Sequence, residues 1–265
     1  SESILETKLR HHYNNSEFAI LYRTNAQSRA LEESLRKRNI PYKIYGGLSF
    51  YQRKEIKDLL AYFRLAINPN DEEALKRIIN YPRRGIGLST LQNLSLIANS
   101  NNTSIWETIV NLDENSQINK GTKKKLNDFS ILINEFILKS KNKDAYYASE
   151  EIAKQSGLFN ELYNDKSPEG VSRFENIQEL LNGIKNFVEQ SEEESNKLED
   201  FMQDVALLTD QDTENDKDFN KVTLMTVHAA KGLEFPYVFV VGLEENMFPN
   251  IMSSESQESL EEERR

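Results

Sequence analysis

The sequence predicts an α/β protein whose parallel sheet is interrupted by an all-helical insertion. Apolar runs of strand length lie near both ends of the chain, at 18–22, 42–45, 222–227 and 237–241. Between them, from Gln52 onward, apolar residues recur with helical spacing. A domain inserted into a surface loop costs little closure entropy, so one sheet domain divided by a helical one is the simplest arrangement.

The first part of the sheet is expected from a strand, a helix and a second strand in succession. Asn39-Ile40-Pro41 ends the helix, because the residue before proline is pushed toward extended geometry. The second strand, Tyr42–Tyr45, is closed by Gly46-Gly47. This order indicates parallel strands. The helix is expected to place its apolar residues on one face and its charged residues elsewhere: Ala30, Leu31 and Leu35 against Arg29, Glu32, Arg36 and Lys37.

The central segment is predicted to be helical throughout. Two sets of apolar residues have the spacing of one helix face: Ile56, Leu59, Leu60 and Phe63, and Leu126, Phe129, Ile133 and Phe136. Breaks between helices are expected at Asn68–Asp71, Tyr81-Pro82 and Ser167–Gly170. Asp210–Asn220 is acidic with few apolar residues and is interpreted as a linker or flexible loop. The predicted boundaries are 1–51 and 218–265 for the sheet domain and 52–217 for the insertion.

Composition excludes several classes of protein. The chain has 265 residues, 38% of them hydrophobic, and no cysteine. This excludes disulfide scaffolds, thiolate zinc sites and cysteine nucleophiles. No apolar run approaches the roughly 20 residues that span a bilayer, and no signal peptide is recognisable. We expect a soluble cytoplasmic protein without a metal site. The chain begins Ser-Glu-Ser and ends Glu-Glu-Glu-Arg-Arg, so we also expect a fragment of a longer protein.

Charge is distributed unevenly along the chain, whose formal net charge is -10. Residues 189–218 contain twelve acidic side chains and two lysines, an excess of ten. Residues 23–57 contain nine basic and three acidic side chains, a balance of +6. Lys76, Arg77, Arg83 and Arg84 add further positive charge. Solvated helix faces or a phosphate-binding stripe on an acidic protein both explain this pattern, and charge alone leaves the two open.

The loop between the two late strands concentrates polar chemistry. Thr226–Pro236 contains His228, Lys231 and Glu234 beside Gly232, whose backbone is permissive. The loop follows the carboxyl end of a predicted parallel strand, where open α/β domains bind ligands. A polar loop with a capping role is the alternative interpretation.

Four stretches together resemble a known family. Thr226–Pro236, continuing through Val238–Pro249, closely resembles the fifth conserved motif of UvrD/PcrA/Rep-type superfamily 1 DNA helicases. Leu21–Arg29, Gly46–Asp58 and Asn80–Gly87 match further motifs of that family in the same order. In these helicases two RecA-like motor domains clamp ATP and move along single-stranded DNA in the 3′-to-5′ direction. The resemblance implies that this chain is the second motor domain with its helical insertion.

The resemblance also implies roles for individual residues. Arg23, Asn25, Thr226 and His228 match positions on the single-stranded DNA side, and Glu234 with Gly232 matches the ATP site, where the carboxylate accepts a hydrogen bond from the ribose. A strand-end salt bridge is the alternative for Arg23, and a structural histidine for His228. Asn250 stands where relatives often have His or Ser against DNA, which weakens that assignment.

A second group of residues resembles the turn with which these helicases grip duplex phosphates. It comprises Arg84, Gly85, Ile86, Gly87 and Thr90. Glycines let backbone N–H groups approach an anion, and a helix beginning near Leu88 would direct its positive end toward it. A plain hinge between two helices is the alternative. Lys123–Lys125 is interpreted as a solvated face.

Missing motifs restrict the enzymology expected of this chain. It contains no Gly-x-x-x-x-Gly-Lys-Ser/Thr phosphate loop. In the family that loop and the magnesium-binding acids belong to the first motor domain, so ATP and Mg²⁺ are expected in the full-length parent and no catalytic residue here. Leu260–Arg265 resembles the opening of the sixth motif, and Arg264 and Arg265 are not its transition-state arginine. We therefore expect no ATP hydrolysis by the chain alone.

The expected partners are DNA, as a single strand and as a junction with duplex, and the first motor domain; repair or transcription proteins are possible. Two other functions stay open. One is the motor of an AddA/RecB-like helicase–nuclease. The other is a non-catalytic interaction module, in which the acidic residues 189–218 bind a protein.

Overall fold

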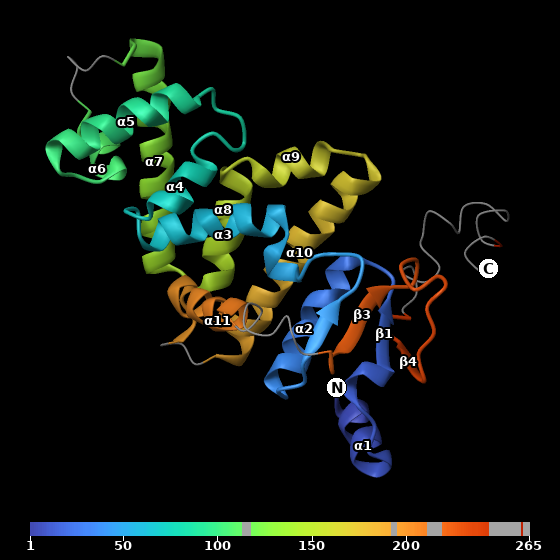
Figure 1. Ribbon diagram of the computed structural model, residues 1–265. Helices are drawn as coiled ribbons and strands as arrows, with labels where there is room; N and C mark the ends of the chain where they lie inside the picture. Colours follow the sequence, from blue (N-terminus) through green and yellow to red (C-terminus); the bar gives the residue numbers. More distant parts are fainter. Residues whose placement is uncertain (113–117, 192–194, 211–218, 244–260, 262–265) are drawn as a thin grey trace. The chain divides into compact units, whose positions relative to one another are not determined.

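The computed structural model describes residues 1–112, 118–191, 195–210, 219–243 and 261 (Figure 1). The chain divides into two compact units: Ser1–Arg53 together with Leu208–Arg265, and Lys54–Leu207. We call the first the sheet unit and the second the helical unit. The predicted fold class, a parallel sheet with an all-helical insertion, is confirmed.

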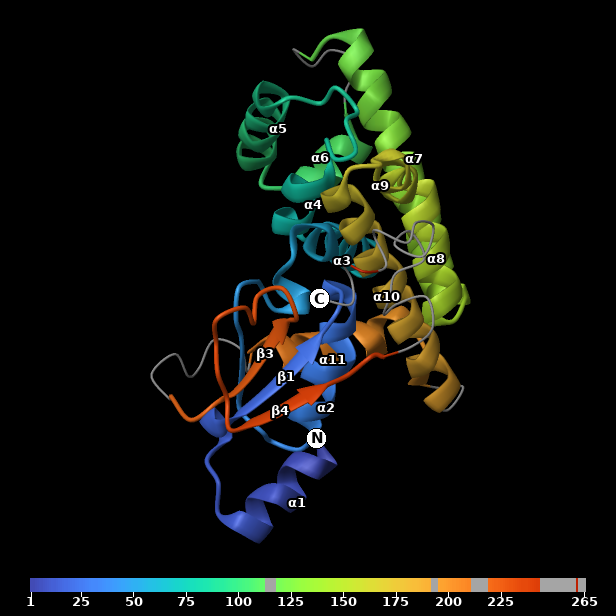
Figure 2. The ribbon, with the colours of Figure 1, turned by 90° about the vertical axis from the view of Figure 1, so that its right-hand side faces the viewer.

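The sheet unit contains four parallel strands in the order β2-β3-β1-β4. Figure 2 shows β3, β1 and β4 side by side. Residues 223–226 pair with 19–22, although the whole insertion separates them in the chain. The elements of this unit are α1 (Glu2–His11), η1 (Asn15–Glu17), β1 (Phe18–Tyr22), η2 (Asn25–Gln27), α2 (Ser28–Lys37), β2 (Tyr42–Ile44), η3 (Phe50–Gln52), β3 (Val222–Thr226) and β4 (Tyr237–Val240).

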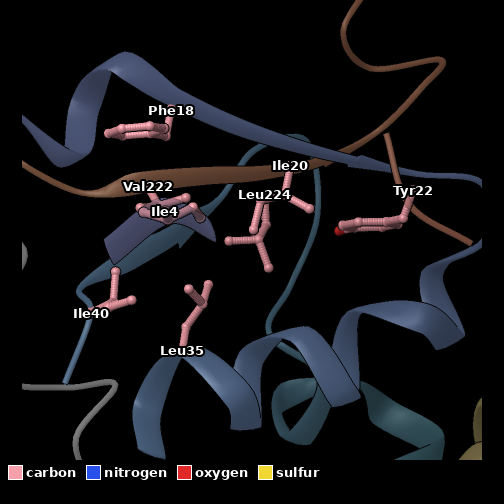
Figure 3. Close-up of a cluster of buried hydrophobic side chains, with 8 residues drawn as sticks. All are labelled: Ile4, Phe18, Ile20, Tyr22, Leu35, Ile40, Val222 and Leu224. Carbon is pink, nitrogen blue, oxygen red and sulfur yellow. The ribbon is translucent and has the colours of Figure 1, made fainter. Parts of the chain in front are cut away.

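One face of the sheet forms the core of the unit (Figure 3). Strand side chains alternate between faces, so every second residue of β1 and β3 points to the same side. Leu35 of α2 and Ile4 of α1 pack against these residues. Helix α1 was not predicted from the sequence, because Ile4 is its single buried residue and one buried position is no periodic signal. The buried cluster is Ile4, Phe18, Ile20, Tyr22, Leu35, Ile40, Val222 and Leu224.

Helix α2 differs from the prediction. Its charged residues Arg29, Glu32 and Arg36 are buried, while Ala30 is exposed. The Glu32 carboxylate accepts hydrogen bonds from the Ser49 hydroxyl at 2.6 Å and from the backbone N–H of Phe50 at 3.0 Å, both in the segment that follows β2. Burying a carboxylate is tolerable when its oxygens are satisfied in this way. The helix therefore contacts its surroundings through charged side chains as well as apolar ones.

The helical unit consists of nine described helices. Helix α3 packs against α4, α7 and α10. The apolar sets predicted on α3 and α7 are buried, so their helical spacing is confirmed. The helices are α3 (Lys54–Ile67), α4 (Glu72–Ile78), α5 (Leu88–Asn101), α6 (Ile105–Val110), α7 (Lys120–Asn142), α8 (Ala145–Gln155), α9 (Leu158–Asn164), α10 (Pro168–Gln190) and α11 (Leu198–Asp210), the last ending beyond the unit.

Polar caps set several of the helix boundaries. Asp71 caps α4 by accepting a hydrogen bond from the backbone N–H of Ala74 at 3.0 Å. Ser167 caps α10, whose first residue is Pro168. The break expected at Ser167–Gly170 is therefore wrong in part, because residues 168–170 already form the first turn of α10. Most of the predicted acidic linker, 211–218, lies outside the described residues. In the described part of the chain, no helix is long and apolar enough to cross a membrane.

Candidate nucleic-acid and nucleotide site

The carboxyl ends of β1 and β3 lie next to each other in the middle of the described sheet. Tyr22 is paired with Thr226, and the backbone N–H of Val227 donates to the Tyr22 carbonyl at 2.9 Å. The chain leaves β1 toward β2 and leaves β3 toward β4, so the two connections run in opposite directions across the sheet. Such a switch point is where open parallel sheets bind ligands.

Arg23 and His228 meet at this switch point. Nη1 of Arg23 lies 3.1 Å from Nδ1 and 3.2 Å from Nε2 of His228. A guanidinium only donates hydrogen bonds, so the imidazole accepts through a ring nitrogen in this arrangement. His228 is exposed and Arg23 is half-buried. The two residues predicted on the DNA side from motifs far apart in the chain are thus brought into contact.

The side chain of Gln27 holds the loop that carries Arg23. Its Oε1 accepts hydrogen bonds from the backbone N–H of Arg23 at 2.9 Å and of Thr24 at 3.1 Å. The same side chain lies against Gly242, just after β4, where an added Cβ would clash with it. Gln27 belongs to the Leu21–Arg29 motif, but the sequence predicts no role for it, because a side chain that fixes the backbone of its neighbours leaves no pattern in the sequence.

The basic stretch at 23–57 does not form a single exposed stripe. Arg29, Arg36 and Arg53 are only 7–8% exposed. Arg29 pairs with Glu33 at 2.9 Å, and Nη1 of Arg53 donates to the carbonyl of Asn25 at 2.7 Å. These three arginines therefore belong neither to a solvated helix face nor to an exposed phosphate-binding stripe, and both interpretations are wrong for them. The side chain of Asn25 is exposed at the carboxyl edge, as a nucleic-acid contact requires.

The turn after β3 combines capping with an open surface. Thr226 Oγ1 accepts from the backbone N–H of Ala229 at 3.2 Å, so the capping role considered for this loop exists. Ala229 also lies close to the loop that follows β2. A Cβ added to Gly46 in that loop would lie 3.3 Å from the Cβ of Ala229. Thr226 is therefore a structural cap whose exposure is intermediate, and its hydroxyl is already engaged by the turn.

Gly232 and Glu234 lie farther along this loop and are both exposed. Gly232 has a φ of +85°, and a Cβ there would meet nothing within 4 Å. Glycine is thus favoured at this position because φ is positive, and not because a larger side chain would clash with a neighbour. Among the described residues, the Glu234 carboxylate has no hydrogen bond or ion pair, which leaves both oxygens able to accept from a hydroxyl.

Arg84 has a different environment from the one expected of a phosphate ligand. Its Nη1 donates to the carbonyls of Ile78 and Pro82, and its Nη2 donates to Tyr62 Oη at 2.7 Å and to the carbonyl of Ser156 at 2.8 Å. Burial raises the pKa of Tyr62 to about 12, and the positive charge of Arg84 opposes that rise. Four guanidinium donors are thus used inside the helical unit. The Arg84 side chain is therefore engaged within the helical unit, and its contact with duplex DNA stays a prediction.

The rest of the turn remains partly available. Ile86 is buried, and Asn80 Oδ1 accepts from the backbone N–H groups of both Arg84 and Ile86 at 3.0 Å. Gly85, with φ of +71°, and Gly87, the N-cap of α5, are exposed. Thr90 is half-buried, and its backbone N–H donates to the Gly87 carbonyl at 3.1 Å. The predicted group therefore divides into Arg84 and Ile86, which hold the turn, and residues at its surface.

Lys125 joins this turn from α7. Its Nζ donates to the Gly85 carbonyl at 3.2 Å, across 40 positions of sequence. The interpretation of Lys123–Lys125 as a solvated face is incomplete, because Lys125 is exposed yet bound to the turn. Asn250, Arg264 and Arg265, which were singled out in the sequence, lie outside the described residues.

Comparison with known proteins places the chain in a family. The model of the UvrD-like helicase C-terminal domain matches residues 1–265. A protein named ATP-dependent DNA helicase PcrA from Staphylococcus epidermidis is 43% identical over 252 residues, which cover 94% of this chain and 34% of that protein. Its namesake from Staphylococcus aureus is 41% identical over 270 residues, covering 100% of this chain and 37% of that protein. The chain thus spans about a third of the length of these curated relatives, and it belongs to the UvrD-like helicase C-terminal domain family.

Proposed function

We propose that this chain is the second motor domain, with its helical insertion, of an ATP-dependent DNA helicase that moves 3′ to 5′. The sheet unit would be the motor domain and the helical unit the insertion. The observation that carries the proposal is the contact of Arg23 with His228 at the switch point of a parallel sheet. The names of the relatives, both ATP-dependent DNA helicases, support the same activity.

At the carboxyl edge of the sheet, Arg23, His228 and Asn25 would each make a different contact with a single DNA strand. Arg23 supplies a positive charge for a phosphate, and His228 lies beside it with a ring that donates or accepts hydrogen bonds. Asn25 adds a neutral amide, which has both a donor and an acceptor. A contact between Arg23 and a phosphate does not distinguish one base from another. We therefore expect DNA binding without sequence preference and with strong salt dependence.

The loop from Gly232 to Glu234 is proposed to hold part of the ATP. An exposed carboxylate suits a ribose hydroxyl, which donates, and repels phosphate, which does not. When bound in the parent, ATP with Mg²⁺ would supply the free energy for closure of the two motor domains. In this chain the role of Glu234 is to orient the sugar, while the first motor domain would supply the phosphate loop.

The turn at Gly85–Gly87 is proposed to contact duplex DNA at the junction. Because Arg84 is engaged within the helical unit, the contacts would come from the backbone of Gly85 and Gly87 and from the cations around them. Arg83 is exposed next to the turn, and Lys125 is bound to it. We therefore propose that these two side chains replace Arg84 as the phosphate contacts.

Binding of labelled oligonucleotides across a salt series tests the proposal. The purified chain is compared on single-stranded DNA and on a duplex with a 3′ tail. We expect salt-sensitive binding that Arg23→Ala weakens on both. If Arg23→Ala leaves DNA binding unchanged but raises the KM for ATP of the full-length parent, Arg23 contacts the nucleotide and not DNA. Absence of binding by chain and parent alike, even at low salt, contradicts the proposal.

A further inference from the structure

We propose that Arg53 is a positioning residue for single-strand binding, acting through Asn25. The inference rests on the function proposed above and extends it to a residue that does not itself reach DNA. Arg53 is the last residue of the first segment of the sheet unit and immediately precedes α3. Its guanidinium holds the backbone of the loop after β1, from which Asn25 projects.

The guanidinium of Arg53 joins three segments of the sheet unit. Nη1 donates to the carbonyl of Asn25 at 2.7 Å. Nη2 donates to the hydroxyl of Ser28, the first residue of α2, at 2.7 Å. Nη2 also lies 3.5 Å from the carbonyl of Leu48, in the loop after β2. Because the guanidinium is planar and its donors point in fixed directions, this arrangement sets the relative positions of all three acceptors.

The surroundings of Arg53 restrict its guanidinium to this arrangement. The residue is 8% exposed, and its Cζ lies 5.2 Å from the centroid of the Phe50 ring, which is fully buried. A positive charge removed from water is costly unless its donors are satisfied, so any movement that breaks these hydrogen bonds is opposed. Lysine would keep the charge but would lose the fixed fork that reaches Asn25 and Ser28 together.

The Asn25 side chain is exposed, so its position is set by the backbone that carries it. Asn25 therefore depends on the support that Arg53 gives to this backbone. Its carbonyl accepts from Arg53 and also from the backbone N–H of Ser28. The other half of the loop is held by Gln27, which accepts from the N–H groups of Arg23 and Thr24. Arg53 and Gln27 thus hold the loop through its backbone, Arg53 at a carbonyl and Gln27 at two N–H groups.

A double-mutant cycle in the full-length parent tests the inference. The variants are Asn25→Ala, Arg53→Lys and the two combined, measured by the dissociation constant for labelled single-stranded DNA and by DNA-stimulated ATP hydrolysis. Loss of one hydrogen bond to DNA makes Asn25→Ala bind about fivefold more weakly. Arg53→Lys has a similar effect, with the KM for DNA raised and kcat unchanged. The double variant is no weaker than either single one, because both act on the same contact.

Tyr51→Phe is the matched control for a structural effect. Tyr51 is buried in the same segment, and its hydroxyl donates to Glu33 Oε1 at 2.8 Å, away from the Asn25 loop. This variant lowers thermal stability and leaves DNA affinity unchanged. If Arg53→Lys fails to fold, Ser28→Ala takes its place in the cycle, because it removes one acceptor of the same guanidinium.

The outcomes separate the inference from the function on which it rests. Independent effects, with the double variant weakened by about twenty-fivefold, overturn the positioning role. So does an Arg53→Lys protein that binds DNA like the wild type while Asn25→Ala binds weakly. If Asn25→Ala and Arg23→Ala both bind DNA normally, the proposed single-strand site itself is wrong, whatever Arg53 does.

Discussion

The guanidinium of Arg23 lies 3.1 Å from Nδ1 of His228, although 205 positions separate the two residues. Arg23 follows β1 and His228 follows β3, and the two strands are neighbours in the sheet. An insertion of helices lies between them in the chain, yet the parallel pairing brings their carboxyl ends together. Because the two side chains are in contact, they are expected to respond to mutation as a pair.

Removal of Arg23 and His228 is expected to weaken single-strand binding non-additively. Arg23→Ala should cost about 1.5 kcal/mol, or roughly tenfold in affinity, because a charge-assisted contact to phosphate is lost. His228→Ala should cost less, and the coupling between them should be about 0.5–1 kcal/mol. Fluorescence anisotropy with labelled DNA measures all four proteins. His11→Ala is the control, since His11 is exposed but stacks on Tyr13 elsewhere in the sheet unit. Additive losses would show that the two side chains act on separate ligands.

Replacement of Glu234 is expected to raise the KM for ATP of the full-length parent. Glu234→Ala removes the acceptor proposed for the ribose and should raise KM by about fivefold, or ~1 kcal/mol, with kcat little changed. Glu234→Gln retains a carbonyl acceptor and should have a smaller effect. Steady-state kinetics at saturating DNA distinguish these cases. Glu6→Ala, at an exposed glutamate of α1, is the control. An unchanged KM in Glu234→Ala would remove this residue from the nucleotide site.

Arg84 and Arg83 are adjacent in sequence and are expected to have opposite roles. Arg84→Ala removes the guanidinium donor to the carbonyls of Ile78, Pro82 and Ser156 and should lower the free energy of unfolding by about 2 kcal/mol. Arg83→Ala should leave stability within ~0.5 kcal/mol and weaken binding to the tailed duplex. Urea denaturation and oligonucleotide binding measure the two effects. A stable Arg84→Ala protein with weakened duplex binding would instead support a direct contact of Arg84 with DNA.

Lys125 is expected to contribute one ionic contact to duplex binding. Lys125→Ala should reduce the slope of log K against log salt by about one for the tailed duplex and not for single-stranded DNA. Lys124→Ala is the matched control, because Lys124 is its exposed neighbour and, among the described residues, makes no contact with the Gly85 turn. Equal slopes for both variants would show that Lys125 serves only to hold the turn.

Asp71 is expected to stabilise the helical unit in a pH-dependent way. Although partial burial opposes ionisation, hydrogen bonds from the Ala74 N–H and from Arg64 lower the pKa of Asp71 below 3.8. The folded protein therefore prefers the ionised form, and this contribution is present above pH 3.8 and disappears as pH falls through the lowered pKa. Asp71→Ala should cost about 1 kcal/mol at neutral pH as a lost N-cap.

Asp71→Asn separates the charge from the cap, because asparagine also caps helices. Its stability should be lower than that of the wild type at neutral pH, and the difference should narrow below pH 3.8. Denaturation by urea at a series of pH values measures this. A difference that does not change with pH would mean that the ionised carboxylate adds nothing to the cap.

The strands and the apolar helix faces could be predicted because their signal is local. β1, β2, β3 and β4 all coincide with apolar runs, to within a residue of the expected ends. The sets on α3 and α7 repeat with a period that only a helix can bury on one side. The motifs also lie where the sequence suggested, in the loops after β1 and β3, because a loop begins where an apolar run ends.

Which charged residues face solvent could not be predicted, because periodicity registers only apolar side chains. Glu32 is fully buried, and its role depends on Ser49 and Phe50, which reach it from a different segment. Arg84 is similar, since one of its acceptors, Ser156, is 72 positions away. A charged side chain is stable in the interior only where separate segments bring enough partners to it.

The sequence by itself determined the four strands, the helical character of the insertion and the segments that carry the candidate site. Tertiary structure alone decided which of those residues share a site and which support it: Arg23 meets His228, Lys125 reaches Gly85, and Arg53 and Arg84 turn inward. The physical reason is that hydrogen bonds and ion pairs depend on positions to within about 0.5 Å, which arise only when distant strands and helices pack. Hydrophobic spacing, by contrast, is already present in the chain before it folds.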